Sequence, residues 1–188
     1  MSRDISPSPR SPLALLEETL TAVRGLLRGE RVTVEGRELR LDGLELVHPP
    51  AADAVPPVIA GVVSPKSLEL AGRAAQGTLV AEGHGPDDLR AVRAAAERGG
   101  ATADHTVTVF TFVGVGEAAA PALREAVAGH AQWLGREESA TFAAGGTATE
   151  AATALRALGD AGAGTVVLRF CGSEPLGQLR AVLTALGT

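Results

Sequence analysis

A single lysine, Lys66, lies where a buried apolar segment passes into a helix. It is the only lysine among 17 basic residues. It follows the apolar run 58–62 in the order Ser64-Pro65-Lys66-Ser67. Ser64 suits the N-cap and Pro65 the first helical position, so free backbone N–H groups and the positive end of the helix dipole lie beside the ammonium group. The pattern favours an anion-binding turn. The simpler interpretation, a solvated lysine in an ordinary loop, stays open.

Few other residues could do chemistry. Glu82 and His84 follow the apolar segment 77–81, at a strand end where a carboxylate or an imidazole could contact a substrate. Cys171, the only cysteine, has no identifiable histidine partner, so we expect a buried or idle thiol rather than a nucleophile. No catalytic pair or metal site is expected, because the four histidines are scattered. The remaining candidates have no predicted chemical role: His48, His105 and His130, with Trp133 expected to pack.

The composition excludes several classes of function. The chain has 188 residues, enough for one domain, and its 45% apolar content can form a core of Ala, Val and Leu, since only 3% is aromatic. A net charge of −5 without a basic cluster argues against a nucleic-acid partner. One cysteine precludes an internal disulfide. No apolar run approaches the roughly 20 residues of a membrane span, and the N-terminus lacks the apolar core of a signal peptide, so we expect a cytoplasmic protein with no membrane partner.

The N-terminal third has its own organisation. Residues 1–12, rich in proline and serine, are predicted to be a flexible segment that precedes the domain at 13–188. Apolar residues at helical spacing then predict a helix from Leu13 to Leu27, ended by Gly29. Residues 31–41 alternate with period two around Glu35-Gly36, which predicts a β-hairpin. With the proline-rich stretch that follows, the insertion runs from about 31 to 57.

From residue 58 onward, strands and helices alternate. The predicted strands are 58–62, 77–81, 106–113 and 165–170, and the predicted helices are 65–76, 86–98, 118–134, 149–161 and 176–186. Strands separated by helices of this length imply right-handed crossovers and a parallel sheet. The fold class is therefore α/β, with four βα units. Four units fit either a small doubly wound sheet or half of an eight-stranded (β/α) barrel, and their number alone does not decide.

One long segment resembles a known family. Residues 55–82, VPPVIAGVVSPKSLELAGRAAQGTLVAE, are similar to the luciferase-like monooxygenase superfamily, and within it to the branch of deazaflavin-dependent reductases of the methylenetetrahydromethanopterin reductase type. The segments 11–32 and 161–168 resemble the family's helix and insertion and its last barrel strand. The resemblance covers residues 11–188. It implies the C-terminal half of a TIM (β/α)8 barrel, with four βα units, a β-hairpin insertion and the first four strands missing.

The resemblance also implies roles for residues. It assigns Gly61, Val62, Ser64, Pro65 and Lys66 to the phosphate end of a cofactor, either the deazaflavin coenzyme F-420 or FMN. Ser64 replaces the family's usual glycine, a change that we expect to be tolerated because serine caps well and leaves amides free. Gln76 replaces its usual aspartate, away from the catalytic face.

Three hypotheses for function follow. The first is a flavin- or deazaflavin-dependent oxidoreductase or monooxygenase domain, truncated and lacking four strands. The second is a non-catalytic or partner-dependent half-barrel that needs a complementary chain. The third is an unrelated phosphate-binding α/β enzyme such as an aldolase or isomerase, for which Lys66 at a helix start is poorly placed to form a Schiff base.

The missing half predicts association. The strands 58–62 and 165–170 would each expose an edge. An inner face lined by Ile59, Val80, Val109 and Val167 or their neighbours would be uncovered. We therefore expect a homo-oligomer, aggregation, or a complementary N-terminal half-barrel as partner. The expected small-molecule ligands are the cofactor and a substrate.

Overall fold

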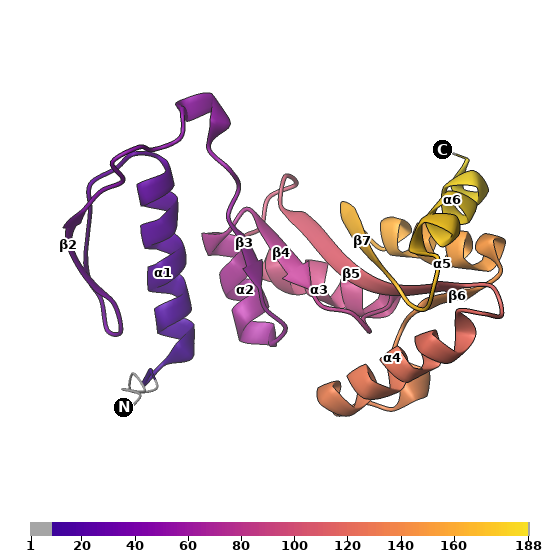
Figure 1. Ribbon diagram of the computed structural model, residues 1–188. Helices are drawn as coiled ribbons and strands as arrows, with labels where there is room; N and C mark the ends of the chain where they lie inside the picture. The colour runs from indigo at the N-terminus through magenta and orange to yellow at the C-terminus, as the bar shows by residue number, and fades with distance from the viewer. Residues whose placement is uncertain (1–8, 188) are drawn as a thin grey trace, which may run out of the picture.

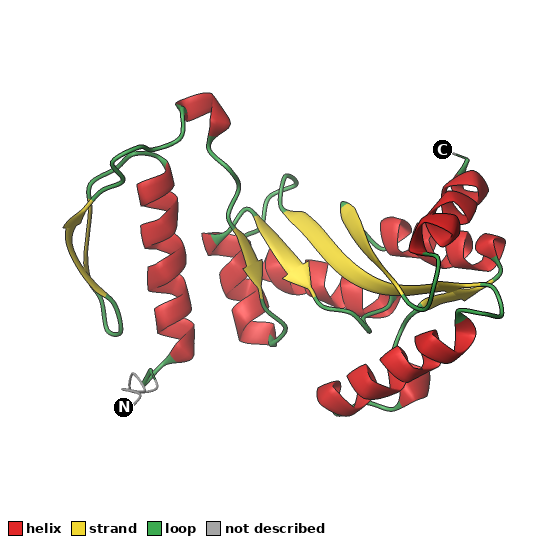
Figure 2. Ribbon diagram, in the orientation of Figure 1, coloured by secondary structure: helices red, strands yellow, loops and turns green. Residues whose placement is uncertain are grey.

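A computed structural model describes residues 9–187 as a parallel sheet flanked by helices, with an N-terminal helix and hairpin at one end (Figure 1, Figure 2). The α/β prediction is therefore confirmed. The helices are α1 (Pro12–Leu27), α2 (Pro65–Ala74), α3 (Pro86–Arg98), α4 (Ala120–Leu134), α5 (Ala148–Asp160) and α6 (Pro175–Leu186). The strands are β1 (Val32–Glu35), β2 (Arg40–Leu44), β3 (Ile59–Gly61), β4 (Gly77–Val80), β5 (Thr106–Val115), β6 (Ala144–Gly146) and β7 (Thr165–Phe170).

The predicted hairpin is present as antiparallel β1 and β2, held against α1 by one carboxylate. Glu18 accepts hydrogen bonds from three consecutive backbone N–H groups of the hairpin loop, those of residues 37, 38 and 39. The predicted flexible segment lies largely outside the described residues, at positions 1–8. Within the described part, the amides of Arg10 and Ser11 donate to the Glu38 carboxylate, and Ser11 caps α1.

The sheet is parallel throughout and centres on the ten-residue strand β5. β3 pairs with β4, and β4 pairs with residues 106–109 of β5. β7 pairs with residues 108–113 and β6 with residues 113–115 of the same strand. Since β7 overlaps both other partners, it takes the opposite edge of β5. The sheet therefore ends at β3 on one side and at β7 on the other, as predicted.

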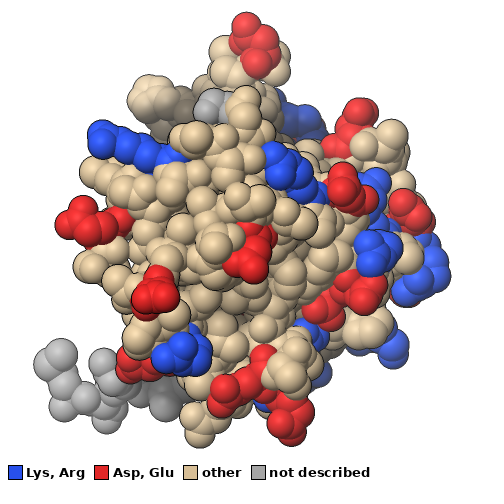
Figure 3. Space-filling view, turned by 90° about the vertical axis from the view of Figure 1, so that its right-hand side faces the viewer, with Lys and Arg blue, Asp and Glu red and all other residues tan. Residues whose placement is uncertain are grey.

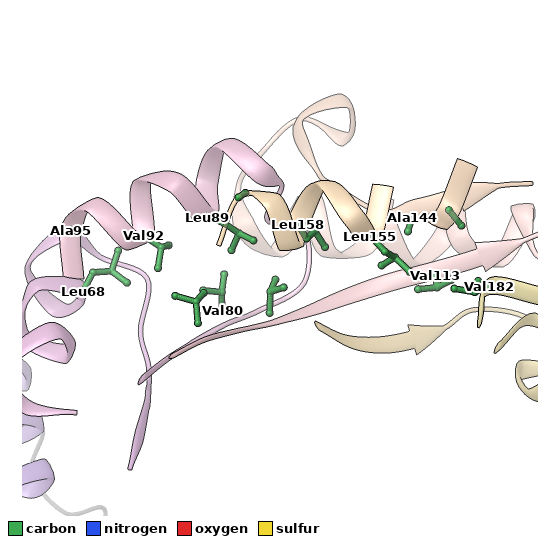
Figure 4. Packing of buried hydrophobic residues seen from close by; sticks show 14 residues of the cluster. Leu68, Val80, Leu89, Val92, Ala95, Val113, Ala144, Leu155, Leu158 and Val182 are labelled. Atoms are coloured by element: carbon green, nitrogen blue, oxygen red, sulfur yellow. The ribbon is translucent and has the colours of Figure 1, made fainter. Parts of the chain in front are cut away.

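The core lies between the sheet and the helices α3, α5 and α6. Figure 4 shows Leu89 and Val92 of α3 and Leu155 and Leu158 of α5 directed at the strands. Val113 of β5 completes this layer and is fully buried. The cluster consists of Leu, Val and Ala, the small core that the low aromatic content predicts, and each fully buried Leu or Val stabilises the fold by about 1.5–3 kcal/mol.

Two glycines let α2 and α3 pack through their backbones. A Cβ atom at Gly72 of α2 would lie 2.0 Å from the carbonyl oxygen of Ala96 in α3, and one at Gly99 would lie 1.9 Å from the carbonyl oxygen of Glu69. Neither position can accept a methyl group without moving a backbone segment. This contact fixes α2, and hence the turn at its N-terminus, against the rest of the sheet.

The other face of the sheet is largely uncovered. Cross-strand pairing places its residues on one side, and we call this set the open face: Ile59, Leu79, Thr108, Phe110 and Val167. All five are exposed or half-buried. Of the residues predicted to line this face, Ile59 and Val167 do so, whereas Val80 and Val109 are 1% and 0% exposed and pack under the helices, and their neighbours Leu79, Thr108 and Phe110 take their place. A strand that is apolar on both faces carries no alternation from which its inward residues can be read.

Only one described helix, α4, covers part of the open side. In Figure 1 it lies on the opposite side of β5 from α5 and α6. Its Leu123 lies against Gly114 and Gly145 at the carboxyl end of the strands, where a Cβ atom on either glycine would approach the leucine within 2.8 Å.

The surface carries no strong patch of one charge on the side drawn in Figure 3, where acidic and basic groups are interspersed among uncharged residues. Within residues 9–187, no helix combines the length and the apolar character needed to cross a bilayer.

Candidate functional site

The β3–α2 turn has the geometry expected from the sequence. Ser64 is the N-cap, and Pro65 and Lys66 begin the helix. The Ser64 hydroxyl accepts from the Ser67 amide at 3.4 Å, while the Ser67 hydroxyl accepts from the Ser64 amide at 3.1 Å. The cap therefore uses two of the turn's amides, so fewer remain free than the sequence suggested. The Lys66 amide is left without a hydrogen-bond partner among the described residues.

Lys66 itself is exposed and takes part in none of the ion pairs found among residues 9–187. The first turn of α2 contains no acidic residue. The first turns of α3 and α5 differ, because Asp88 accepts from the Gly85 amide and Glu150 from the Thr147 amide. Those two helix ends are neutralised by their own carboxylates, and the end of α2 is open to an external anion.

Gly61 leaves space at the approach to this turn. A Cβ atom there would meet no atom within 4 Å, and the residue is exposed. The glycine is thus not required by packing within the described chain. If the turn binds an anion, the absence of a side chain at Gly61 lets the anion approach the backbone.

His84 lies beside the turn. A cavity of about 230 Å³ between α2 and α3 is lined by Val62, Val63 and Pro65 from the turn and by His84 from the β4–α3 loop. His84 is 6% exposed, and its Nδ1 lies 3.1 Å from the carbonyl oxygen of Ala81. Since a carbonyl only accepts, Nδ1 carries the proton and Nε2 is left as an acceptor when the ring is neutral.

Glu82 faces a different region, the open side of the sheet. Its Oε1 accepts a hydrogen bond of 3.1 Å from Arg169 Nη1, so the ion pair links β7 to the end of β4 across β5. The Arg169 guanidinium lies 5.3 Å from the centre of the Phe112 ring of β5. Burial alone would raise the pKa of Glu82, but hydrogen bonds from its own backbone N–H and from Arg169 outweigh it and hold the pKa below the ordinary value.

Two residues of α4 that were assigned no chemical role border this ion pair. His130 Nε2 donates to the carbonyl oxygen of Glu82 at 2.9 Å, and its ring meets Phe112 edge-on at 5.4 Å. Trp133 lies against His130 with ring centres 5.3 Å apart. Trp133 was expected to pack, and it does so only against His130, since 74% of it is exposed.

The remaining polar candidates are structural. Cys171 is buried, as predicted, and burial raises the pKa of its thiol. Gln178, buried on α6, accepts from the Val115 amide and donates to the carbonyl oxygens of Cys171 and Ser173, which fixes the β7–α6 loop. His105, 7% exposed, pairs with the Thr78 hydroxyl at 2.9 Å at the opposite end of the strands.

The chain also matches a known protein family. The model of the luciferase-like monooxygenase family matches residues 4–181. The chain belongs to this family.

Similar curated proteins are enzymes of this group. Over 82 residues the chain is 37% identical to a 5,10-methylenetetrahydromethanopterin reductase of Methanolobus tindarius, a match that covers 44% of this chain and 24% of the relative. Over 109 residues it is 33% identical to an F420-dependent glucose-6-phosphate dehydrogenase of Nakamurella multipartita, covering 55% and 32%. The matched segments thus span a quarter to a third of these relatives.

Solved structures confirm the barrel-type fold of this luciferase-like chain. The coenzyme F420-dependent tetrahydromethanopterin reductase of Methanopyrus kandleri superposes with a TM-score of 0.72 at 18% identity, over 93% of this chain and 62% of that one. An F420-dependent secondary alcohol dehydrogenase, solved with an F420–acetone adduct, gives 0.66 at 14% identity, over 96% and 77%. The chain spans 62% and 77% of these two solved structures.

Proposed function

We propose that this chain is the C-terminal half of an F420- or FMN-dependent luciferase-like oxidoreductase and that its β3–α2 turn binds the phosphate of the cofactor. The observation that carries the proposal is the open N-terminus of α2: within residues 9–187 the Lys66 ammonium has no ion pair and the Lys66 amide no hydrogen bond, and the first turn has no carboxylate. The names of its relatives point to the same cofactor, since the dehydrogenase from Nakamurella and both F420-dependent solved structures depend on F420.

The residues present suit a phosphate group. The Lys66 ammonium and amide both offer donors, and the helix dipole favours negative charge at the same point. Gly61 leaves the backbone accessible. When bound, the cofactor would supply the hydride chemistry, and these residues would hold its phosphate end.

The proposal includes a requirement for a second wall. The turn can hold one end of a cofactor, while no element of residues 9–187 lies opposite most of the open face to hold the cofactor ring there. Loss of orientation can remove about 7–11 kcal/mol of catalytic advantage, far more than a phosphate contact restores. We therefore expect little or no turnover from the chain alone, and activity when four further strands complete the barrel.

A direct binding measurement tests the phosphate site. F420 and FMN are titrated separately into the purified chain by calorimetry. Lys66→Ala should weaken binding by about 1–2 kcal/mol, the contribution of a partly exposed charge-assisted hydrogen bond. Arg180→Ala removes an exposed cation on α6 and serves as the matched control, which should bind like the unaltered chain. Equal affinities of the Lys66 and Arg180 variants would refute the site.

A mixing experiment separates the two alternatives for activity. The chain is assayed with reduced F420 and with reduced FMN, alone and with the N-terminal half-barrel of a relative. Turnover only on mixing supports a partner-dependent half-barrel. Full turnover by the chain alone contradicts the need for a second wall, and a chain that binds cofactor but stays inactive on mixing supports the non-catalytic alternative.

A further inference from the structure

A second hollow lies on the open side of the sheet, apart from the β3–α2 turn. It has a volume of about 440 Å³ and is formed by β5, β7 and α4. None of the residues proposed to hold the cofactor phosphate lines it. Its lining residues are Phe112, Ala122, Glu125, Ala126, Gly129, His130, Trp133 and Arg169.

The shape of the hollow suits a flat molecule. The residues Ala122, Ala126 and Gly129 recur at helical spacing along one face of α4 and form a smooth wall. These three positions carry no long side chain, and further along the helix stands Trp133, which is 74% exposed. Exposure of so large an apolar ring is uncommon, since burial of its surface is favourable. The exposed face of the ring is therefore available for stacking.

The indole is supported from behind. Trp133 contacts His130, and His130 in turn meets Phe112 edge-on, with ring centres 5.3 and 5.4 Å apart. The hydrogen bond from His130 to the Glu82 carbonyl fixes the middle ring of this series. A supported ring loses little conformational freedom when a ligand stacks on it.

Arg169 brings a cation to the hollow beside Phe112, the ring that His130 also contacts, and is paired with Glu82 on one side. Arg169 is 65% exposed as a side chain, and its hydrogen bond to Glu82 uses Nη1. The Nε and Nη2 donors have no hydrogen-bond partner among the described residues. The Phe112 ring and Glu82 hold the guanidinium in one orientation, which leaves a free edge suited to an oxyanion.

The far end of the hollow carries the opposite charge. Glu125 precedes Trp133 by eight residues, which corresponds to about 12 Å along a helix. A carboxylate there disfavours an anionic group at that end and favours its placement beside Arg169. The two charges would thus orient a ligand along the hollow.

We propose that this hollow binds a planar conjugated anion, such as an aromatic carboxylate, with its ring on Trp133 and its acid group at Arg169. The identification of this anion as the substrate rests on the proposed oxidoreductase function. Binding of the anion in the hollow does not depend on the cofactor site.

Trp133 is the only tryptophan in the chain, so its fluorescence reports on this hollow alone. The probes are 4-nitrobenzoate, the neutral 4-nitrobenzyl alcohol and the cationic 4-nitrobenzylamine, each corrected for collisional quenching with free N-acetyltryptophanamide. We expect saturable quenching by 4-nitrobenzoate, about tenfold tighter than by the alcohol, which is the difference that one charge-assisted contact makes. Non-saturating quenching by all three probes, or tightest binding of the amine, would overturn the proposal.

Variants identify the contact. Arg169→Gln should remove the preference for the acid over the alcohol, Arg169→Lys should retain part of it, and Arg180→Gln should leave it unchanged. The single indole N–H signal in a ¹H–¹⁵N spectrum checks that Trp133 keeps its surroundings in each variant. If Arg169→Gln keeps that signal and still prefers the acid, the proposal fails.

Two further arms separate this proposal from the cofactor site. Lys66→Ala should not alter 4-nitrobenzoate binding, so the hollow can be confirmed even when F420 and FMN fail to bind. Displacement of 4-nitrobenzoate by riboflavin, which carries the flavin ring without a phosphate, would assign the hollow to the cofactor ring and contradict a substrate site.

Discussion

Replacing Gly72 with alanine tests the contact that positions the α2 turn. The new methyl group would lie 2.0 Å from the Ala96 carbonyl oxygen, whereas real contacts of this kind are rarely below 3.0 Å. The helices must therefore separate by about 1 Å, because the obstructing atom is backbone. Such overpacking costs about 1–3 kcal/mol of unfolding free energy, which is set against the better helix propensity of alanine.

Gly159→Ala is the matched control. Gly159 lies inside α5, and a Cβ atom there meets nothing within 4 Å. Its replacement should stabilise the protein by about 0.5–1 kcal/mol through helix propensity alone. Because the propensity gain is common to both variants, they should differ by the overpacking cost alone, about 1–3 kcal/mol.

Urea denaturation measures both variants. The denaturant midpoint should fall for Gly72→Ala and rise for Gly159→Ala, with the slope unchanged, since neither substitution alters the surface exposed on unfolding. In a thermal scan, each kcal/mol should correspond to about 2–4 °C for a chain of this size. If both variants gain stability equally, α2 and α3 do not pack through their backbones, and the position assigned to the Lys66 turn loses its support.

Three further predictions concern charge and association. Arg169→Gln should raise the pKa of Glu82, which carboxyl NMR can follow, and an unchanged pKa in the variant would contradict the ion pair. In the unaltered chain the pKa of Glu82 is lowered, so its stabilisation is present above about pH 4.5 and is lost as the pH falls through the lower folded value. Burial lowers the pKa of His105, so stability should decline as the pH falls below 6.5. In urea denaturation, His105→Gln should flatten this decline between about pH 7.5 and 5.5, and an unchanged decline would contradict the buried neutral ring. The open face and the free edges of β3 and β7 should make the chain associate, so light scattering from a stable monomer at tens of micromolar would count against an uncovered half-barrel.

Sequence periodicity was sufficient for most of the fold. The helices and four main strands were predicted because their apolar patterns are long and end at proline, glycine or serine. β6 was missed, since Ala144-Gly145-Gly146 has no β-branched residue and gains its strand conformation only by pairing with β5. Helix α4 was predicted, but its placement over the open side depends on Leu123 meeting Gly114 and Gly145, which belong to two different strands.

The candidate sites differ in the same way. The β3–α2 turn is local, so its cap, proline and lysine could be recognised from adjacent residues. The hollow is not local, because Arg169 and Glu82 are 87 residues apart and Trp133 comes from a third element. Only the isolated tryptophan in an aromatic-poor chain could have drawn attention to it, and a helical tryptophan is usually buried.

The pairing pattern of β5 has a consequence for how the chain acquires its fold. This strand alone joins β3 and β4, formed early in the sequence, to β6 and β7, formed late. Among the described residues, the only direct bridge between the N-terminal and C-terminal parts of the sheet joins Gly83 to Phe142, and all other pairing runs through β5. A nascent chain that ends before Thr106 therefore exposes the free edge of β4, and pairing can pass to the C-terminal elements only after β5 has docked. The backbone amides of residues 107–113 should accordingly be the last to exchange with solvent deuterium, and the order of assembly runs outward from the centre of this strand.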